Sequence, residues 1–188
     1  YKELKEQYFK NTIFKSNGDG EVIMHLYLKF GINFISKIKG MFAIAIIDQN
    51  KKKLILKRNC LGVKPLYFWK KSKLVNFSSE IKSINNIDKK INHNSLIRYQ
   101  LFQSPYENQT LYEGVEKVVP GQILEFNLSN EIFIKESFIK INKYRYNNFD
   151  EFFYKIKQDF NEILENVFST NLNKSFHISG GLDSNLII

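Results

Sequence analysis

The spacing of apolar residues changes near residue 40, and this change constrains the fold more than any other feature of the sequence. Over Asp19–Phe30 the apolar residues recur at helical spacing, and the stretch starts with an acid and stops before a glycine. Over residues 41–47 (MFAIAII) they are continuous, which is typical of a strand buried on both faces. The chain therefore combines helices with a sheet.

Three further short apolar runs follow, and only tight polar turns separate them. We expect strands at residues 54–57, 66–69 and 74–77. Consecutive short strands joined in this way indicate an antiparallel sheet. A short helix that starts at residues 79–81, with Ser79 as its cap, and another over residues 95–102 are expected next.

Two different residue patterns follow one another in the middle of the chain. Residues 105–121 have no clear period, and we expect an irregular connection there. Residues 122–128 and 131–139 then predict a hairpin that turns at Ser129 and Asn130.

The last part of the sequence predicts one long helix followed by a strand. Asn148 and Glu151 have the spacing of a capping box, and residues 175–178 are a short apolar run. A helix followed by a strand is how a parallel α/β domain begins. The apolar residues of Phe149–Phe168 lie on one helical stripe: Phe149, Phe152, Phe153, Ile156, Phe160, Ile163, Leu164, Val167 and Phe168.

Composition excludes several classes of function. The net charge is +9, from 28 Lys and Arg against 19 Asp and Glu, but the bases are spread over short turns such as residues 51–53. We therefore expect no nucleic-acid partner. The longest apolar run, residues 41–47, is too short to cross a bilayer, and residues 1–10 do not form a signal or transit peptide. We expect a cytoplasmic protein with no membrane partner.

The single cysteine and the two ends of the chain suggest a piece of a longer intracellular protein. Cys60 is the one cysteine, so it has no partner for an internal disulfide. The chain starts at Tyr1 rather than Met and stops at Ile188 within an apolar stretch. We expect a fragment.

The sequence SGGLDS, from Ser179 to Ser184, lies between the last predicted strand and a following helix. A glycine-rich turn in this place brings backbone N–H groups to the end of a sheet, which suits a phosphate. Gly180 and Gly181 allow close approach, and Asp183 is a candidate ligand for magnesium on the phosphates. The alternative is an ordinary Gly-Gly turn with Asp183 as a helix cap.

The motif does not stand alone. SGGLDS resembles the pyrophosphate loop of ATP pyrophosphatases, and GMFAIAIID, RNCLGVKPLYF, FSSEIKSI and VVPGQ match in order the signatures of glutamine-hydrolysing asparagine synthetases. This resemblance covers nearly the whole chain. It implies a fold of class α/β in two parts. Residues 1–141 would be the C-terminal part of a glutaminase domain, α+β and Ntn-hydrolase-like, with antiparallel sheets sandwiched by helices. Residues 142–188 would begin a parallel α/β ATP-pyrophosphatase domain.

The resemblance also implies a reaction. In that family the glutaminase domain frees ammonia from glutamine, and the synthetase domain uses Mg²⁺ and ATP to adenylate the side-chain carboxylate of aspartate. Ammonia then displaces AMP, and asparagine, glutamate and pyrophosphate are the other products. The implied cofactors are ATP and Mg²⁺, the implied partners are glutamine, aspartate and ATP, and a homodimer is a candidate assembly.

Site residues follow from the resemblance position by position. Ile178 would contact the nucleotide through its backbone. Asn185 stands where the family usually has a second serine, and His177 stands where it commonly has an apolar residue, so we interpret His177 as a core residue. The residues that would surround the pyrophosphate and its Mg²⁺ are Ser179, Gly180, Gly181, Asp183 and Ser184.

On the glutaminase side, Asp19 matches the acid that holds the α-amino group of glutamine, with a helix cap as the alternative. Gly18 replaces a serine common before that acid, and Asn59 replaces an aspartate common after Arg58. The family's nucleophile is an N-terminal cysteine whose own α-amine is the base. Cys60 cannot take this role because its nitrogen is in a peptide bond, so we expect the fragment to be inactive by itself.

Three hypotheses result. The first is an asparagine synthase, a glutamine-hydrolysing ligase, of which this chain is a fragment. The second is a paralogue that amidates another carboxylate, such as that of a sugar acid. The third is a degenerate binding module without catalysis, for which Gly18, Asn59 and Asn185 are mild support.

Overall fold

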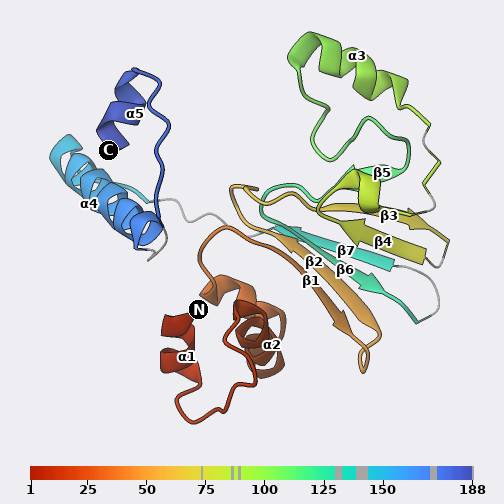
Figure 1. Ribbon diagram of the computed structural model, residues 1–188, viewed down its shortest axis with the longest axis horizontal. Helices are drawn as coiled ribbons and strands as arrows, with labels where there is room; N and C mark the ends of the chain where they lie inside the picture. The colour runs from red at the N-terminus through yellow and green to blue at the C-terminus, as the bar shows by residue number, and fades with distance from the viewer. Residues whose placement is uncertain are drawn as a thin grey trace. The chain divides into compact units, whose positions relative to one another are not determined.

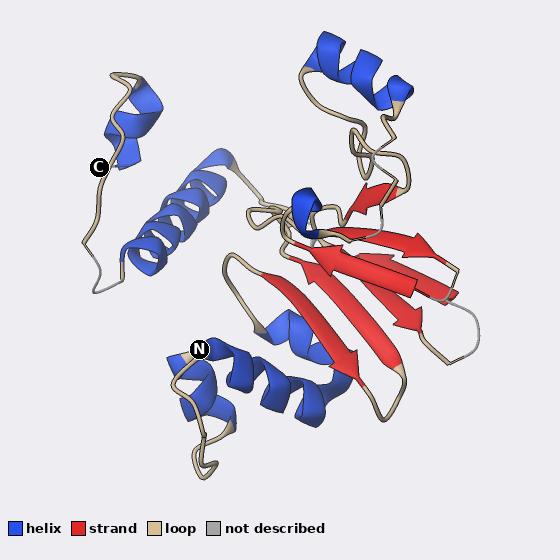
Figure 2. Cartoon of the chain, turned by 45° about the vertical axis from the view of Figure 1, so that its right-hand side comes forward, coloured by secondary structure: helices blue, strands red, loops and turns tan. Residues whose placement is uncertain are grey.

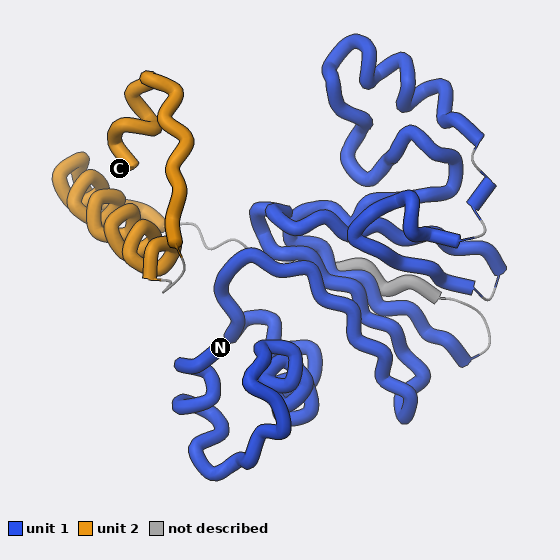
Figure 3. Tube along the Cα trace, viewed as in Figure 1, with its two compact units in different colours: residues 1–140 blue, residues 141–188 orange. Residues whose placement is uncertain are grey.

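The chain forms two compact units, Tyr1–Lys140 and Ile141–Ile188, which Figure 3 draws in blue and orange. Each unit is described by itself below. The structure, a computed structural model, describes residues 1–72, 74–85, 87–88, 90–129, 133–138 (backbone only), 144–169 and 173–187.

Two helices and a 3-10 helix precede the first strand of the first unit (Figure 1). They are α1 (Lys2–Tyr8), α2 (Asp19–Phe30) and η1 (Gly31–Lys37). The prediction of a helix over Asp19–Phe30 is confirmed at both ends. The short helix α1 has no counterpart among the predicted elements.

The larger sheet contains four antiparallel strands in the order β1-β2-β6-β7. Their bounds are Ala43–Asp48, Lys53–Arg58, Gln122–Asn127 and Phe133–Phe138. The predicted hairpin of β6 and β7 is confirmed, because Gln122 pairs with Phe138 and Asn127 with Phe133. Its turn at Asn130 lies outside the described residues.

A second antiparallel sheet has the strand order β4-β3-β5, formed by Leu74–Ser78, Tyr67–Lys71 and Val115–Lys117 (Figure 2). The four consecutive predicted strands are therefore present and antiparallel, but the chain changes sheet between β2 and β3. The strand β5 lies inside the region expected to be irregular. With only three residues it is too short to show a period of two in the sequence.

The prediction that residues 41–47 are buried on both faces is wrong. β1 is the edge strand of its sheet, and its side chains alternate. Ile44 and Ile46 pack against the cluster formed with α2, whereas Ala45 and Ile47 are exposed. A continuous apolar run shows that both faces of a strand are apolar, but only the tertiary structure decides whether both are covered.

Two details of the helices after β4 also differ from expectation. The helix after Ser79 is the 3-10 helix η2 (Ile81–Ser83), which begins after Glu80 without a side-chain cap, so Ser79 is not a cap. Helix α3 (His93–Phe102) begins two residues earlier than predicted because the Asn92 side chain accepts a hydrogen bond from the Ser95 N–H at 3.1 Å. Asn92 satisfies one of the free amides of the first turn.

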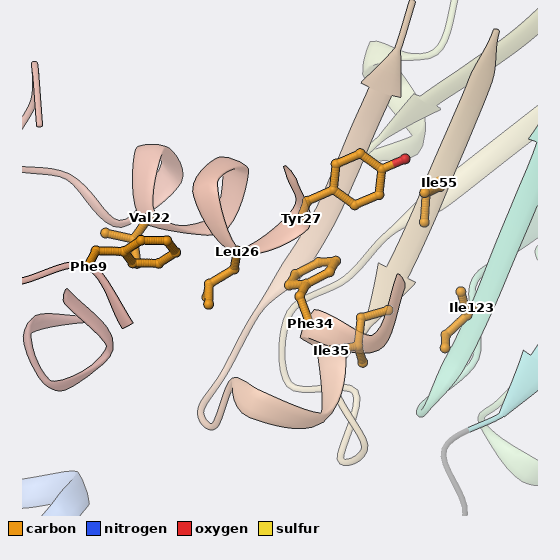
Figure 4. Close-up of a cluster of buried hydrophobic side chains, with 8 residues drawn as sticks. All are labelled: Phe9, Val22, Leu26, Tyr27, Phe34, Ile35, Ile55 and Ile123. Carbon is orange, nitrogen blue, oxygen red and sulfur yellow. The ribbon is translucent and has the colours of Figure 1, made fainter. Parts of the chain in front are cut away.

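The two faces of the larger sheet contribute side chains to two separate hydrophobic cores. Ile55 and Ile123 face α2 and η1, while Leu54, Leu56 and Leu124 face the second sheet. This alternation along β2 produces a layered structure of helices, sheet and sheet, as the predicted antiparallel fold class requires. Figure 4 shows the core on the helix side: Phe9, Val22, Leu26, Tyr27, Phe34, Ile35, Ile55 and Ile123.

The second unit contains α4 (Phe149–Phe168) and α5 (Leu182–Ile187). The predicted bounds of α4 are confirmed, and the Asn148 side chain accepts from the Glu151 N–H at 2.8 Å. The Glu151 carboxylate reaches back to the N–H of Asn147, at 3.0 Å, rather than to that of Asn148. The capping box is therefore displaced by one residue.

The predicted strand at residues 175–178 is absent from the structure. A strand needs a hydrogen-bonded neighbour, and no described residue pairs with this segment. Its parallel sheet stays a prediction. Within the described part of the chain, no helix is long and apolar enough to span a bilayer.

Candidate functional site

A cavity of about 780 Å³ lies beside α2 and the edge strand β1. This volume falls within the range of small-molecule sites, roughly 300–1,000 Å³. One wall consists of α2 residues such as Ile23 and Met24, and the other is the stretch from Met41 to Ile47. Its polar lining residues include Asp19, Lys39, Lys64 and Ser79.

Asp19 lies at the start of α2 and lines this cavity. The N-cap of the helix is Gly18, and no side chain caps the helix, so the alternative role of Asp19 as a cap is not what the structure shows. A carboxylate in the first turn is stabilised by the helix dipole. The Asp19 carboxylate is therefore available to a cationic group in the cavity.

Glu21 organises the loop that leads to Asp19. Its carboxylate accepts hydrogen bonds from the Lys15 N–H at 2.9 Å, the Ser16 N–H at 2.7 Å and the Ser16 hydroxyl at 2.8 Å. These bonds, that from Lys15 first, lower the pKa of Glu21 to about 2. Glu21 is not among the predicted site residues, although a Glu three residues after a helix N-cap is a known signal.

Arg58 fixes the turn that presents Lys64 to the cavity. Its guanidinium donates to the carbonyl oxygens of Lys64 at 2.8 Å, Val118 at 2.9 Å and Gly62. Gly62 has φ +62°, and a Cβ there would lie 2.6 Å from Cγ of Pro120. The turn therefore requires both the arginine and the glycine.

Asn59 stabilises the same turn through hydrogen bonds, although its side chain carries no charge. Its side-chain oxygen accepts from the Val63 N–H at 3.1 Å, and its backbone carbonyl accepts from Gly62 at 2.9 Å and Gly121 at 3.0 Å. The acceptor that an aspartate would supply is thus still present. Cys60 beside it is exposed.

Lys57 is fully buried in β2, and the sequence did not single it out. Its ammonium group donates to the carbonyl oxygen of Gly121 at 2.7 Å. Burial lowers the pKa of Lys57 to about 8. This amine joins β2 to the turn before β6.

The predicted nucleotide loop lies in the second unit, where the structure brings its two serines together. The hydroxyls of Ser179 and Ser184 are 3.1 Å apart, and the Gly181 N–H donates to the Ser179 hydroxyl at 3.3 Å. Gly180 has φ +77°, which favours glycine. Asp183 lies in the first turn of α5.

The two residues before this loop are exposed. Ile178 is 62% exposed, and His177 is exposed within its unit, contrary to its interpretation as a core residue. A core needs covering elements; beside this segment the ring of Phe168 lies against that of Phe176, with the ring centroids 5.3 Å apart.

Comparisons with known proteins agree with the resemblance. Residues 1–138 match the family model for a glutamine amidotransferase domain. The chain is 49% identical over 84 residues, 45% of its length, to asparagine synthetase [glutamine-hydrolyzing] 2 of Bacillus subtilis, of which the match covers 11%. It is 30% identical over its whole length to asparagine synthetase [glutamine-hydrolyzing] 1 of the same organism, of which it spans 30%.

Among solved structures, glutamine phosphoribosylpyrophosphate amidotransferase from B. subtilis, in complex with ADP and GMP, matches 75% of this chain and 27% of its own. The TM-score is 0.48 and the identity 21%. The matched family model covers all the elements that surround Asp19. The chain belongs to the glutamine amidotransferase domain family.

Proposed function

We propose that this chain provides part of the glutamine site and the start of the nucleotide site of a glutamine-dependent asparagine synthetase. The reaction converts aspartate, glutamine and ATP to asparagine, glutamate, AMP and pyrophosphate. The observation that carries the proposal is the position of Asp19 on a cavity of about 780 Å³ within the matched glutamine amidotransferase range. The names of the relatives matched over the chain support asparagine as the product.

Asp19 has the chemistry to bind the α-ammonium group of glutamine. A carboxylate and an ammonium group form a charge-assisted hydrogen bond, which is about twice as strong as a neutral one. The apolar residues Ile23 and Met24 beside it would contact the aliphatic part of an amino acid. In this proposal Asp19 binds and orients glutamine and takes no part in breaking its amide bond.

The residues of the nucleotide loop fit a magnesium-bound pyrophosphate group. Mg²⁺ in proteins usually keeps one or two carboxylates together with phosphate oxygens and water. Asp183, in the first turn of α5, is the carboxylate at this loop. Ser179 and Ser184 would donate to the phosphate oxygens, and Ile178 would meet the nucleotide through its backbone.

When bound, ATP with Mg²⁺ supplies the adenylyl group that activates a carboxylate for attack by ammonia. Ser179, Gly180, Gly181 and Ser184 would orient the pyrophosphate that leaves. Gly180 contributes by its conformation, because its φ is +77°. Beyond its chain neighbours, a Cβ there would meet no atom within 4 Å.

The experiment uses the intact protein with glutamine, aspartate, Mg²⁺ and ATP, and measures pyrophosphate. Release that requires aspartate is expected, and ammonium chloride should replace glutamine. Release with another acid and none with aspartate would favour the paralogue that amidates a different carboxylate. Absence of release with any acid, together with absence of glutamate formation, would favour the binding module.

Two variants test the two sites separately. Asp19→Asn should raise the KM for glutamine while leaving synthesis from ammonia intact. Asp183→Ala should abolish synthesis from both nitrogen sources, because it removes the proposed magnesium ligand. If Asp183→Ala turns over like the unaltered protein, the nucleotide loop has been assigned wrongly.

A further inference from the structure

Asp19 lies between two glycines, Gly18 and Gly20, which restrict its backbone little. A Cβ at Gly20 would meet nothing within 4 Å, and one at Gly18 would meet only the Ser16 hydroxyl, at 3.9 Å. Neither residue next to Asp19 therefore has a side chain that packs and helps to hold the start of α2 in place. A carboxylate that must meet an ammonium group needs another constraint.

Glu21 supplies such a constraint. In an ordinary capping box the Glu at this position binds the N–H of the N-cap residue, which here would be Gly18. Instead its two carboxylate oxygens accept three hydrogen bonds from Lys15 and Ser16, further back along the chain. These bonds close residues 15–21 into a ring that contains Asp19.

His25, one turn further along α2, lies beside Glu21 and connects it to the core. The Nε2 atom of His25 lies 3.8 Å from its Oε1 atom. The His25 ring packs against the rings of Phe9 at 5.7 Å and Phe14 at 5.1 Å, and Phe9 belongs to the buried core. The ring of residues 15–21 is thus tied to the core through Glu21.

We propose that Glu21 is a positioning residue for glutamine: it fixes the loop at residues 15–18 so that the Asp19 carboxylate stands ready for the α-ammonium group. This inference rests on the proposed function. Glu21 does not touch the substrate. It acts through Asp19, and its removal should weaken glutamine binding without changing the chemistry of ammonia transfer.

The test compares Glu21→Gln with the unaltered intact protein. Glutamine keeps the size of the side chain, but one oxygen becomes an NH₂ group that cannot accept from the loop amides. The KM for glutamine should rise roughly tenfold, which corresponds to about 1.4 kcal/mol. The kcat with saturating glutamine and the rate with ammonia should stay within about twofold of the unaltered protein.

Three further variants compare the size of the change in the KM for glutamine. Ser16→Ala removes one bond to Glu21 and keeps the two backbone bonds, so the KM should rise less than for Glu21→Gln. Asp19→Asn should raise it at least as much. Glu113→Gln is the matched control, because Glu113 pairs with Lys90 at 2.9 Å and does not line the cavity.

The outcomes separate this inference from the proposed function. An unchanged KM for glutamine in Glu21→Gln, with Asp19→Asn impaired, overturns the role of Glu21 and leaves the proposed function standing. Equal loss with glutamine and with ammonia overturns it too, since Glu21 would then support the whole fold. If the unaltered protein uses ammonia but not glutamine, both the glutamine site and the role of Glu21 are overturned.

Discussion

Helices α2 and α4 have similarly clear apolar patterns but different surroundings. In α2, Val22 and Leu26 are fully buried against the sheet. In α4 none of the described residues is buried, and Phe153 is 58% exposed. Both helices begin and end where the sequence predicts, so a helix can be set by local signals whether or not its apolar face is covered.

The strands show the opposite behaviour. In the first unit β2 lies between two neighbours and is buried along most of its length. In the second unit residues 175–178 are also apolar in part, but no described residue pairs with them and they form no strand. A helix satisfies its backbone within itself, whereas a strand depends on residues far away in the sequence.

The largest expected effect contrasts one phenylalanine in each unit. Phe34→Ala, at a fully buried position, should lower the free energy of unfolding by about 3–5 kcal/mol, because it removes apolar contacts and leaves a cavity. Phe153→Ala should lower it by less than about 1 kcal/mol. Urea unfolding followed by circular dichroism measures both. A comparable loss for Phe153→Ala would contradict the difference between the two helices.

The next effect concerns the buried amine of the first unit. The pKa of Lys57 is lowered from 10.5 to about 8, so the unfolded chain binds more protons than the folded one between these values. The free energy of unfolding should therefore rise by about 2–3 kcal/mol from pH 8 to pH 10. Above pH 10 Tyr27, whose pKa is raised to about 12, acts in the opposite direction.

Lys57→Met is the matched variant for this pH dependence, because it keeps an unbranched side chain and removes the titrating group. Urea unfolding of both proteins at pH 7, 8, 9 and 10 should show a rise that is smaller in Lys57→Met. Parallel curves for the two proteins would mean that Lys57 keeps an ordinary pKa in the folded chain.

A smaller effect contrasts a crowded turn with an open one. Gly62→Ala should lower the free energy of unfolding by about 2 kcal/mol, because φ at this position is +62° and the new Cβ would meet Pro120. Gly121 has φ +78°, but a Cβ there would meet no atom within 4 Å. Gly121→Ala should therefore lower the free energy of unfolding by less than Gly62→Ala does. Fluorescence of Trp69, the one tryptophan, reports the unfolding of this unit. Equal losses would show that crowding at Gly62 does not matter.

The smallest effect compares two helix caps. Asn92 and Asn148 both accept a hydrogen bond from the residue three positions later, at 3.1 and 2.8 Å. Alanine at either position should cost about 1 kcal/mol and reduce the helical signal in circular dichroism. The two losses should be similar, because capping is local. A much larger loss at Asn92 would show that tertiary contacts contribute to that cap.

Residues of the proposed glutamine site were predictable to different degrees. Asp19 was predicted from the family resemblance, and the structure places it at the start of α2 and on the cavity. Glu21 belongs to the same helix, but its partners Lys15 and Ser16 lie in a loop without a period. The burial of Lys57 was not predictable either, since a lysine in a short strand usually points to solvent.

The sequence by itself determined the helices α2 and α4, the antiparallel hairpins and the order of the motifs, because these depend on residues close together in the chain. Only the tertiary structure decided that β3 leaves the sheet of β2 and that β1 is an edge. Such features depend on which distant surfaces meet. That choice is made by burial and hydrogen bonding over the whole unit, which no local pattern contains.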